Sequence, residues 1–182
     1  DIIKINSYKH EAQERLIVEE LATNLIGVKI ASEKINKLKA KQMPISNEEV
    51  ALFKENLPFK LTNAQERTIK EISDDISLTK PMRRLVQGDV GSGKTVVAAV
   101  SMYISAKNNT QSVLLCPTEV LAEQHFKNFS EWFKNSNIKI ELLTGKMPVS
   151  KRKGIYQDLE DGGIDILIGT HAVFQDKVKM KN

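Results

Sequence analysis

The sequence lacks the features of secreted, metal-binding and membrane proteins. Its 182 residues include one cysteine, Cys116, so no disulfide can form within the chain. The three histidines are scattered and show no metal-ligand spacing. The longest apolar runs, such as Val113 to Cys116, are far shorter than the roughly 20 residues of a membrane span. We therefore expect a soluble protein of a reducing, cytoplasmic compartment.

Aromatic residues are also few, and the positive and negative charges nearly balance. Aromatic side chains make up 5% of the chain, and the net charge is +4 with a pI of about 9.0. So mild a basic excess is compatible with a nucleic-acid partner but does not require one. No basic segment is followed by an apolar one, so we expect no secretory leader, and the first residue, Asp1, suggests a fragment. The hydrophobic fraction of 41% excludes wholesale disorder.

Residues 1–56 are expected to form a helical segment. No proline occurs from Glu11 to about Lys41, and we predict a helix there that ends at Pro44. Ser46 and Glu49 fit a capping box, which predicts a short second helix. The first helix is amphipathic, because apolar side chains recur every three to five residues among charged ones: Leu16, Leu21, Leu25 and Val28. Its simplest interpretation is a structural helix that lies on a neighbouring domain.

From residue 57 onward, short β-rich runs alternate with longer helical ones. This alternation predicts an α/β fold with a parallel sheet covered by helices on both faces. Ligands of such sheets bind beyond the carboxyl ends of the strands. The expected strands are Leu85 to Gln87, Ser112 to Cys116, Ile138 to Leu142 and Ile164 to Ile168. The expected helices are Ala64 to Ile76, Lys94 to Ala106, Glu119 to Phe133 and Ser150 to Leu159.

Residues 88–95 match the phosphate-loop pattern G-x-x-x-x-G-K-[ST]. They follow a predicted strand and precede a predicted helix, which is the context that the motif requires. Glycines let the backbone wrap a polyphosphate, and the helix N-terminus supplies positive potential. We expect Lys94 to contact the β- and γ-phosphates of ATP and Thr95 to hold Mg²⁺. Nucleotide binding is the firmest inference from the sequence.

Hydrolysis of the nucleotide would require a further acidic residue to hold Mg²⁺ and position water. An apolar strand that ends in aspartate would supply it, yet the predicted strands run into Pro117 and Gly169. Asp165 precedes its strand and is therefore expected at the opposite end. The sequence predicts a nucleotide-binding site without its hydrolytic acid.

Thr62 and Gln65 form a second capping-box pattern at the start of a predicted helix. Gln65 could serve only as a cap. Its amide carries both a donor and an acceptor, however, so it could also match the N6 and N7 edge of adenine. A position shortly before the phosphate loop favours this second role.

The order of these segments resembles the first motor domain of superfamily 2 DNA helicases, most closely the RecG family. A nearby competitor, the transcription-repair coupling factor translocase, shares most of the pattern. The likeness extends from about Leu57 to Val178, and the helix around Arg15 to Leu21 resembles the connector that precedes the motor. The residues that carry it are Leu61 to Gln65, Gln87 to Thr95, Pro117 to His125, Thr144-Gly145 and Ile168 to Ala172.

The resemblance implies a RecA-like P-loop NTPase sheet and two sets of site residues. The ATP-binding set is Leu61, Thr62, Gln65, Gly88, Asp89, Val90, Gly91, Ser92, Gly93, Lys94 and Thr95. Within it, Lys94 and Thr95 would be catalytic, and Thr95 would be the Mg²⁺ ligand. The DNA-binding set is Pro117, Thr118, Gln124, His125, Thr144, Gly145, Gly169, Thr170 and His171. Hydroxyls, amides and backbone N–H groups of this kind contact phosphates without reading sequence.

The resemblance also implies a domain organisation and a partner. Residues 1–56 would be a helical connector, and residues 57–182 would be an incomplete ATP-binding domain that stops before the Asp-Glu-x-His motif. We expect ATP and Mg²⁺ as cofactors, branched or forked DNA as a sequence-independent partner, and a monomer. Two simpler roles stay open, since Thr118 could be only a helix N-cap and His125 only a packed side chain. A nucleotide-binding switch or kinase with no DNA role is the alternative function.

Overall fold

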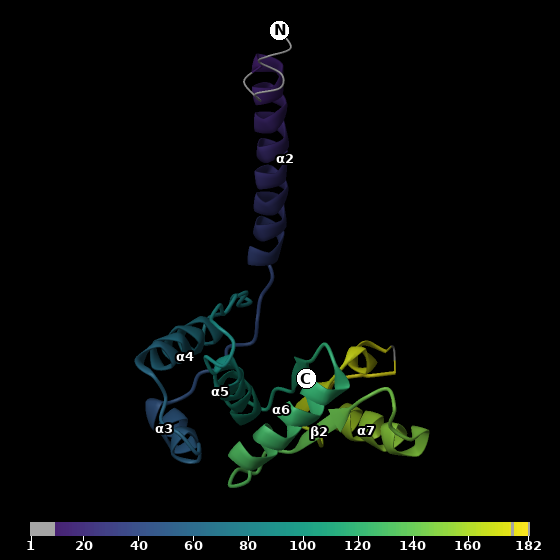
Figure 1. The fold of residues 1–182 in the computed structure, drawn as a ribbon. Helices are drawn as coiled ribbons and strands as arrows, with labels where there is room; N and C mark the ends of the chain where they lie inside the picture. The colour runs from purple at the N-terminus through teal and green to yellow at the C-terminus, as the bar shows by residue number, and fades with distance from the viewer. Residues whose placement is uncertain (1–9, 176, 182) are drawn as a thin grey trace. The chain divides into compact units, whose positions relative to one another are not determined.

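A computed structural model describes residues 10–175 and 177–181. The chain divides into two compact units. The described part of the first comprises residues 10–41 and Thr79–Pro81; the second comprises Gln42–Leu78 and the residues from Met82 onward. Figure 1 shows the helices and strands of each unit.

The first unit contains helix α2 (Glu11–Asn36), which begins where the sequence predicts. Its N-cap is His10, whose Nδ1 accepts a hydrogen bond from the Ala12 N–H at 3.2 Å. The prediction that the helix continues to about Lys41 and ends at Pro44 is wrong. The chain leaves the helix at Lys37, and the Ala40 N–H then donates to the Thr79 carbonyl at 2.8 Å. A hydrogen bond to a distant residue replaces the helical one.

The second unit is built around a parallel sheet, as predicted, but with three strands in place of the four expected, in the order β1-β3-β2. The strands are β1 (Ser112–Leu115), β2 (Ile140–Leu143) and β3 (Ile166–Gly169). Leu115 and Leu143 both lie opposite Gly169, so the three strands end at the same level. The loops that follow them therefore emerge at one edge of the sheet.

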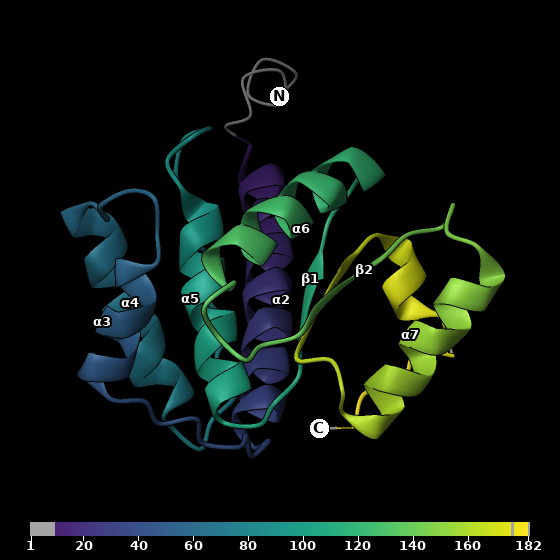
Figure 2. The same ribbon diagram turned by 90° about the horizontal axis from the view of Figure 1, so that it is seen from below.

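Helices cover the two faces of this sheet. Helices α5 (Lys94–Lys107) and α6 (Glu119–Trp132) lie against one face, and α7 (Val149–Asp161) and the 3₁₀ helix η1 (His171–Phe174) lie against the other. Helices α3 (Asn47–Glu55) and α4 (Asn63–Ile76) pack against α5. Helices α3, α4 and α5 lie side by side (Figure 2). Alternate residues of β3 face different cores: Ile166 and Ile168 pack with α5 and α6, whereas Leu167 packs with α7 and η1.

Both predicted capping boxes are present. The Ser46 hydroxyl accepts from the Glu49 N–H at 3.1 Å at the start of α3. At the start of α4, the Thr62 N–H donates to the Gln65 side-chain oxygen at 2.8 Å, and the Gln65 N–H donates to the Thr62 hydroxyl. These reciprocal bonds satisfy backbone donors that a helix start leaves free.

The predicted strand Leu85 to Gln87 is not a strand. These residues pair with no strand of the described chain, and Leu85 is 88% exposed. A strand exists only when its backbone groups find a neighbouring ladder. The segment is instead held by side chains: Val86 packs against the larger core, and Arg84 bonds to Glu71 and Asp75 of α4.

Helix α3 belongs to the second unit. Phe53 is 2% exposed and stacks on Tyr103 of α5 with ring centroids 4.7 Å apart. The expected division after residue 56, between a helical connector and an ATP-binding domain, stays a prediction.

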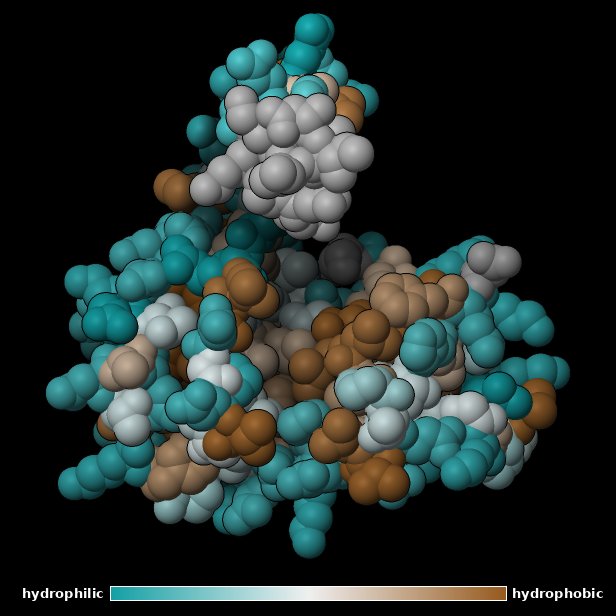
Figure 3. All heavy atoms as spheres, turned by 45° about the horizontal axis from the view of Figure 1, so that its top comes forward, coloured by the Kyte–Doolittle hydropathy of each residue, from teal (hydrophilic) through white to brown (hydrophobic). Residues whose placement is uncertain are grey.

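On the surface, brown hydrophobic side chains lie among teal hydrophilic ones (Figure 3). In the described part of the chain, no helix combines the length and apolar character needed to cross a membrane.

Candidate functional site

The phosphate loop turns sharply before α5, and its glycines have a steric reason. Gly91 and Gly93 adopt φ values of 80° and 77°, which lie in the left-handed region that side chains with a Cβ disfavour. Gly93 is also the N-cap of α5, so the loop leads directly into a helix N-terminus. The predicted loop therefore has both the backbone freedom and the positive helix end that polyphosphate binding uses.

Lys94 folds back over this loop. Its ammonium donates to the carbonyl oxygens of Gly88 and Asp89 at 2.8 and 2.7 Å, and it lies 3.4 Å from the Ser92 hydroxyl. Thr95 follows in the first turn of α5 and is half-buried. An ammonium, a hydroxyl and a helix N-terminus in one loop fit the phosphates of ATP, with Thr95 as the residue that would hold Mg²⁺.

Gln65 links the start of α4 to the phosphate loop. Its Nε2 donates to the Ser92 carbonyl at 3.0 Å, while its Oε1 accepts from the Thr62 N–H. An amide has two N–H donors and two acceptor lone pairs, so these bonds use one of each. Capping and adenine recognition are therefore compatible in Gln65. The same contact explains the small residue at Gly93, where a Cβ would lie 2.3 Å from the Gln65 Nε2.

A cavity of about 390 Å³ brings many of these residues together. It is lined by Thr62, Ala64, Gln65, Thr68, Val86, Gln87, Gly88, Asp89, Ser92, Lys94 and Val97. The predicted Leu61, Val90, Gly91, Gly93 and Thr95 are not among the lining residues. Over residues 10–175 and 177–181, no three His, Cys, Asp or Glu side chains gather as a metal site.

The residues predicted to bind DNA lie mostly in loops at the carboxyl edge of the sheet. Pro117 and Thr118 follow β1, Thr144 and Gly145 follow β2, and Thr170 and His171 follow β3. The Cys116 N–H donates to the Gly169 carbonyl at 2.8 Å, which extends the β1–β3 pairing to the start of the first loop. Gln124 and His125 lie further along α6.

These predicted DNA contacts differ in exposure. Pro117, Thr118, Gln124, Gly145 and His171 are exposed, and Thr170 is half-buried. Thr144, in contrast, is 5% exposed, and Gly169 is buried. Burial favours a packing role for these two residues over direct contact with a phosphate backbone.

Thr118 and His125 have further roles in the fold. The Thr118 hydroxyl caps α6 by accepting from the Leu121 N–H at 3.3 Å. Its own O–H is still a donor, so capping leaves it able to bond a phosphate oxygen. His125 is half-buried, and its Nδ1 is buried without a hydrogen-bond partner among the described residues. That position favours packing over solvent-facing chemistry.

The sequence interpretation missed two charged residues that organise this region. Glu119 and Lys146 form an ion pair at 2.9 Å between the start of α6 and the loop after β2. The hydrogen bond to Lys146 lowers the pKa of the Glu119 carboxyl, and the same bond raises the pKa of the Lys146 ammonium. An acidic residue directly after the N-cap Thr118 was the one available signal, since carboxylates favour a helix N-terminus.

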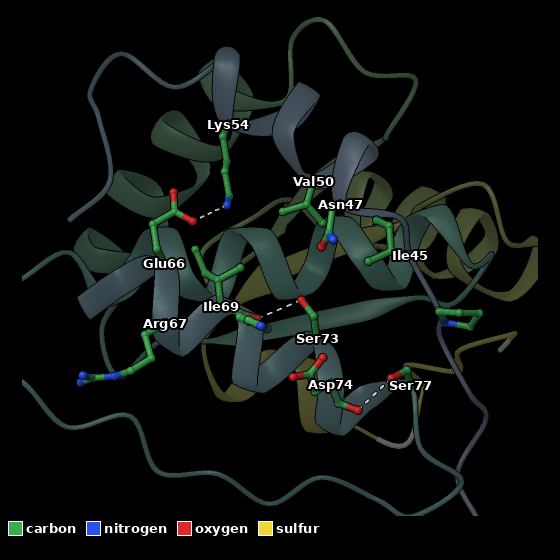
Figure 4. A pocket seen from close by; sticks show the side chains of 12 residues that line it. Ile45, Asn47, Val50, Lys54, Glu66, Arg67, Ile69, Ser73, Asp74 and Ser77 are labelled. Atoms are coloured by element: carbon green, nitrogen blue, oxygen red, sulfur yellow. Dashed lines mark hydrogen bonds and ion pairs between the residues drawn. The ribbon is translucent and has the colours of Figure 1, made fainter. Parts of the chain in front are cut away.

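A larger cavity of about 670 Å³ lies between α3 and α4 (Figure 4), and none of the predicted site residues lines it. Lys54 of α3 bonds to Glu66 of α4 at this cavity. The hydroxyls of Ser73 and Ser77 donate to carbonyl oxygens of α4. Because these polar groups already have protein partners, the cavity is best explained as a packing feature between the two helices.

Known relatives agree with this geometry. The model of the DEAD/DEAH box helicase family matches residues 62–182. The chain is 43% identical over 178 residues to the ATP-dependent DNA helicase RecG of Aquifex aeolicus, and 42% identical over 176 residues to that of Thermotoga maritima. These matches cover 98% and 94% of this chain but 22% of each relative. The chain therefore spans less than a quarter of the length of these two relatives.

A solved structure supports the same assignment. The structure of RecG bound to a three-way DNA junction matches 93% of this chain and 23% of that chain, with a TM-score of 0.85 and 40% identity. The parallel sheet and the phosphate loop therefore form a helicase RecA-like fold, as the sequence predicted. The chain belongs to the DEAD/DEAH box helicase family.

Proposed function

We propose that this chain is the ATP-binding part of an ATP-dependent DNA helicase or translocase that remodels forked and four-way junctions in recombination and repair. One observation carries the proposal: Gln65 of α4 donates to the Ser92 carbonyl of the phosphate loop, and both residues line one cavity. A group suited to an adenine edge thus lies beside groups suited to phosphates. The similar proteins named as ATP-dependent DNA helicases support this assignment.

In this proposal, residues 57–182 are the ATP-binding domain and residues 1–56 are the connector. Lys94 neutralises phosphate charge, and Thr95 holds Mg²⁺, which would polarise the transferred phosphoryl group when bound. Leu61, Thr62 and Gln65 hold the adenine end. We expect this chain alone to bind ATP without turnover, because none of the three described strands ends in an acidic residue.

In this proposal the protein acts as a monomer in the cytoplasm. Its partner is branched or forked DNA, which it binds without sequence preference. Support comes from the three loops at the carboxyl edge of the sheet, where the Thr118 hydroxyl, Gly145 and His171 are exposed. Such groups contact phosphates and carry no sequence information. The solved RecG structure is bound to a three-way junction, which agrees with a branched partner.

The test is Mg-ATP binding and turnover by this chain, with and without forked DNA. Lys94→Ala should weaken ATP binding by about tenfold or more, since an ion–phosphate contact is worth about 1.5–3 kcal/mol. Lys107→Ala removes the same side chain from the other end of α5 and serves as the matched control. Robust turnover by the chain alone would contradict the proposal, because an unassigned residue would have to act as the hydrolytic acid.

Salt dependence separates the alternatives. A DNA motor binds DNA with an affinity that falls steeply as salt rises, because counterions are released from the phosphates. A nucleotide-binding switch or kinase shows ATP binding with no such DNA affinity. A coupling-factor-like translocase would bind linear duplex as well as forked DNA, so comparing the two substrates distinguishes it from the junction enzyme.

A further inference from the structure

Glu119 joins two of the loops assigned to DNA, although the sequence did not mark it as a site residue. It is the first residue of α6, directly after the N-cap Thr118. One oxygen of its carboxylate lies 2.9 Å from the Lys146 ammonium, and a Cβ on Gly145 would lie 3.6 Å from its Oε1. The nearby backbone N–H groups of Gly145 and Lys146 also favour its ionised form. The Glu119 side chain is 25% exposed, whereas that of Lys146 is 89% exposed. The carboxylate thus fastens the loop after β2 to the start of α6.

Thr144 is buried and Met147 packs against the smaller core, but the hydrogen bonds within this loop are long. The Thr144 N–H donates to the Met147 sulfur at 3.4 Å, and the Met147 N–H donates to the Thr144 carbonyl at 3.4 Å. Both distances are at the long end for hydrogen bonds. Gly145 has no side chain with which to hold its position. The ion pair with Glu119 is therefore the strongest polar contact that ties this loop to the start of α6.

The surroundings keep this carboxylate ionised. The Lys146 ammonium, the two backbone N–H groups and the N-terminal end of α6 all favour the negative form. Glu123, one turn further along α6, is exposed and exerts only a charge effect on Lys146. Of these two acidic residues on one helix, only Glu119 pairs directly with the loop.

We propose that Glu119 is a positioning residue for DNA binding, which holds the loop after β2 so that the Lys146 ammonium meets the phosphate backbone beside Thr118. This inference rests on the proposed function. Simple electrostatics makes the opposite prediction: a carboxylate near DNA repels phosphates, so its removal should tighten binding. The sign of the effect distinguishes a positioning role from a charge effect.

Two conservative variants distinguish the length of the Glu119 side chain from its charge. Glu119→Gln loses the charge but keeps an oxygen at the same distance, so it should bind forked DNA within about twofold of the unmodified chain. Glu119→Asp keeps the charge but is one methylene shorter, so it should bind about five- to tenfold more weakly. Glu123→Ala is the matched control, and it should bind as tightly as the unmodified chain or slightly more tightly.

Binding is measured by fluorescence anisotropy of labelled forked DNA over a range of salt concentrations, with ATP binding recorded for every variant. Lys146→Ala should flatten the slope of log K against log salt by about 0.9, the value for one lost phosphate contact. Adding Lys146→Ala to the Glu119→Asp variant should flatten that variant's slope little further, since the shorter aspartate has already displaced the Lys146 ammonium from the DNA. Retained ATP binding shows that each variant is folded.

The outcomes decide between the hypotheses. Weak binding by Glu119→Asp, near-normal binding by Glu119→Gln and unchanged ATP binding would support the positioning role. The inference is overturned if Glu119→Asp binds DNA as well as the unmodified chain, or loses ATP binding in parallel with DNA binding. If the unmodified chain shows no salt-sensitive DNA affinity, the proposed function itself fails, which is a separate result.

Discussion

Replacing Gly169 by alanine should destabilise the fold, although both residues are small. Gly169 ends β3 and is buried. A Cβ at this position would lie 2.3 Å from the carbonyl oxygen of Leu143 and 2.7 Å from Cγ1 of Val173. Leu143 belongs to the paired strand β2, so its carbonyl cannot rotate away as a side chain could. The alanine variant must therefore shift the pairing of β2 with β3.

The magnitude follows from this geometry. Overpacking a close-packed interior costs about 1–3 kcal/mol. Because the obstacle is backbone, we expect the upper part of that range, about 2–3 kcal/mol. In a chain of this size, that loss lowers Tm by about 4–12 °C. Gly154→Ala is the matched control: its Cβ would have no neighbour within 4 Å, and removing a glycine from inside α7 should stabilise the fold by about 0.8–1 kcal/mol.

Urea unfolding followed by far-UV circular dichroism measures both variants. The same chemical change should move the midpoint in opposite directions at Gly169 and Gly154. Equal stability of the Gly169→Ala variant and the unmodified chain would refute the packing argument. If the Gly169→Ala variant kept its stability but lost DNA affinity, Gly169 would act through contact with DNA, as the sequence first suggested.

Four further predictions concern individual side chains. Thr62→Ala removes the N-cap of α4 and should lower the free energy of unfolding by about 1 kcal/mol in thermal melts. Arg84→Ala removes ion pairs to two carboxylates of α4, and its small destabilisation should shrink as NaCl approaches about 1 M. Burial raises the pKa of the Cys116 thiol, so the native protein should react with a thiol reagent far more slowly than the unfolded chain. The Lys146 hydrogen bond lowers the pKa of the Glu119 carboxyl. The stability that the ionised carboxylate contributes is therefore present above the ordinary carboxyl pKa of about 4.3, and it is lost as the pH falls through the lowered pKa. Acid titration of Glu119→Gln should lack this component.

The local elements were predictable because their signals lie within a few residues. A hydroxyl and a glutamate or glutamine three positions later predicted both capping boxes, and the structure confirms the starts of α3 and α4. Glycine spacing predicted the turn before α5, where positive φ values occur at Gly91 and Gly93. In each case, neighbours in the sequence are also the physical partners.

Features that depend on distant partners were not predictable. The segment Leu85 to Gln87 has the composition of a strand, but composition does not provide a neighbouring ladder. The length of α2 depends on a bond between Ala40 and Thr79. In the same way, the burial of Gly169 follows from strand order, which places β3 between β1 and β2.

The predicted nucleotide-binding helix α5 and the first of the predicted DNA loops adjoin one hydrophobic core. Lys94 and Thr95 begin α5, and the next residues, Val96 and Val97, are 1% and 4% exposed. They belong to the same core as Cys116, which follows β1 and precedes the first loop. A close-packed interior transmits displacements, because it has no voids to absorb them. A displacement of the first turn of α5 would therefore be felt at the start of that loop, and this continuous packing is what the proposed coupling of ATP binding to DNA contact would use.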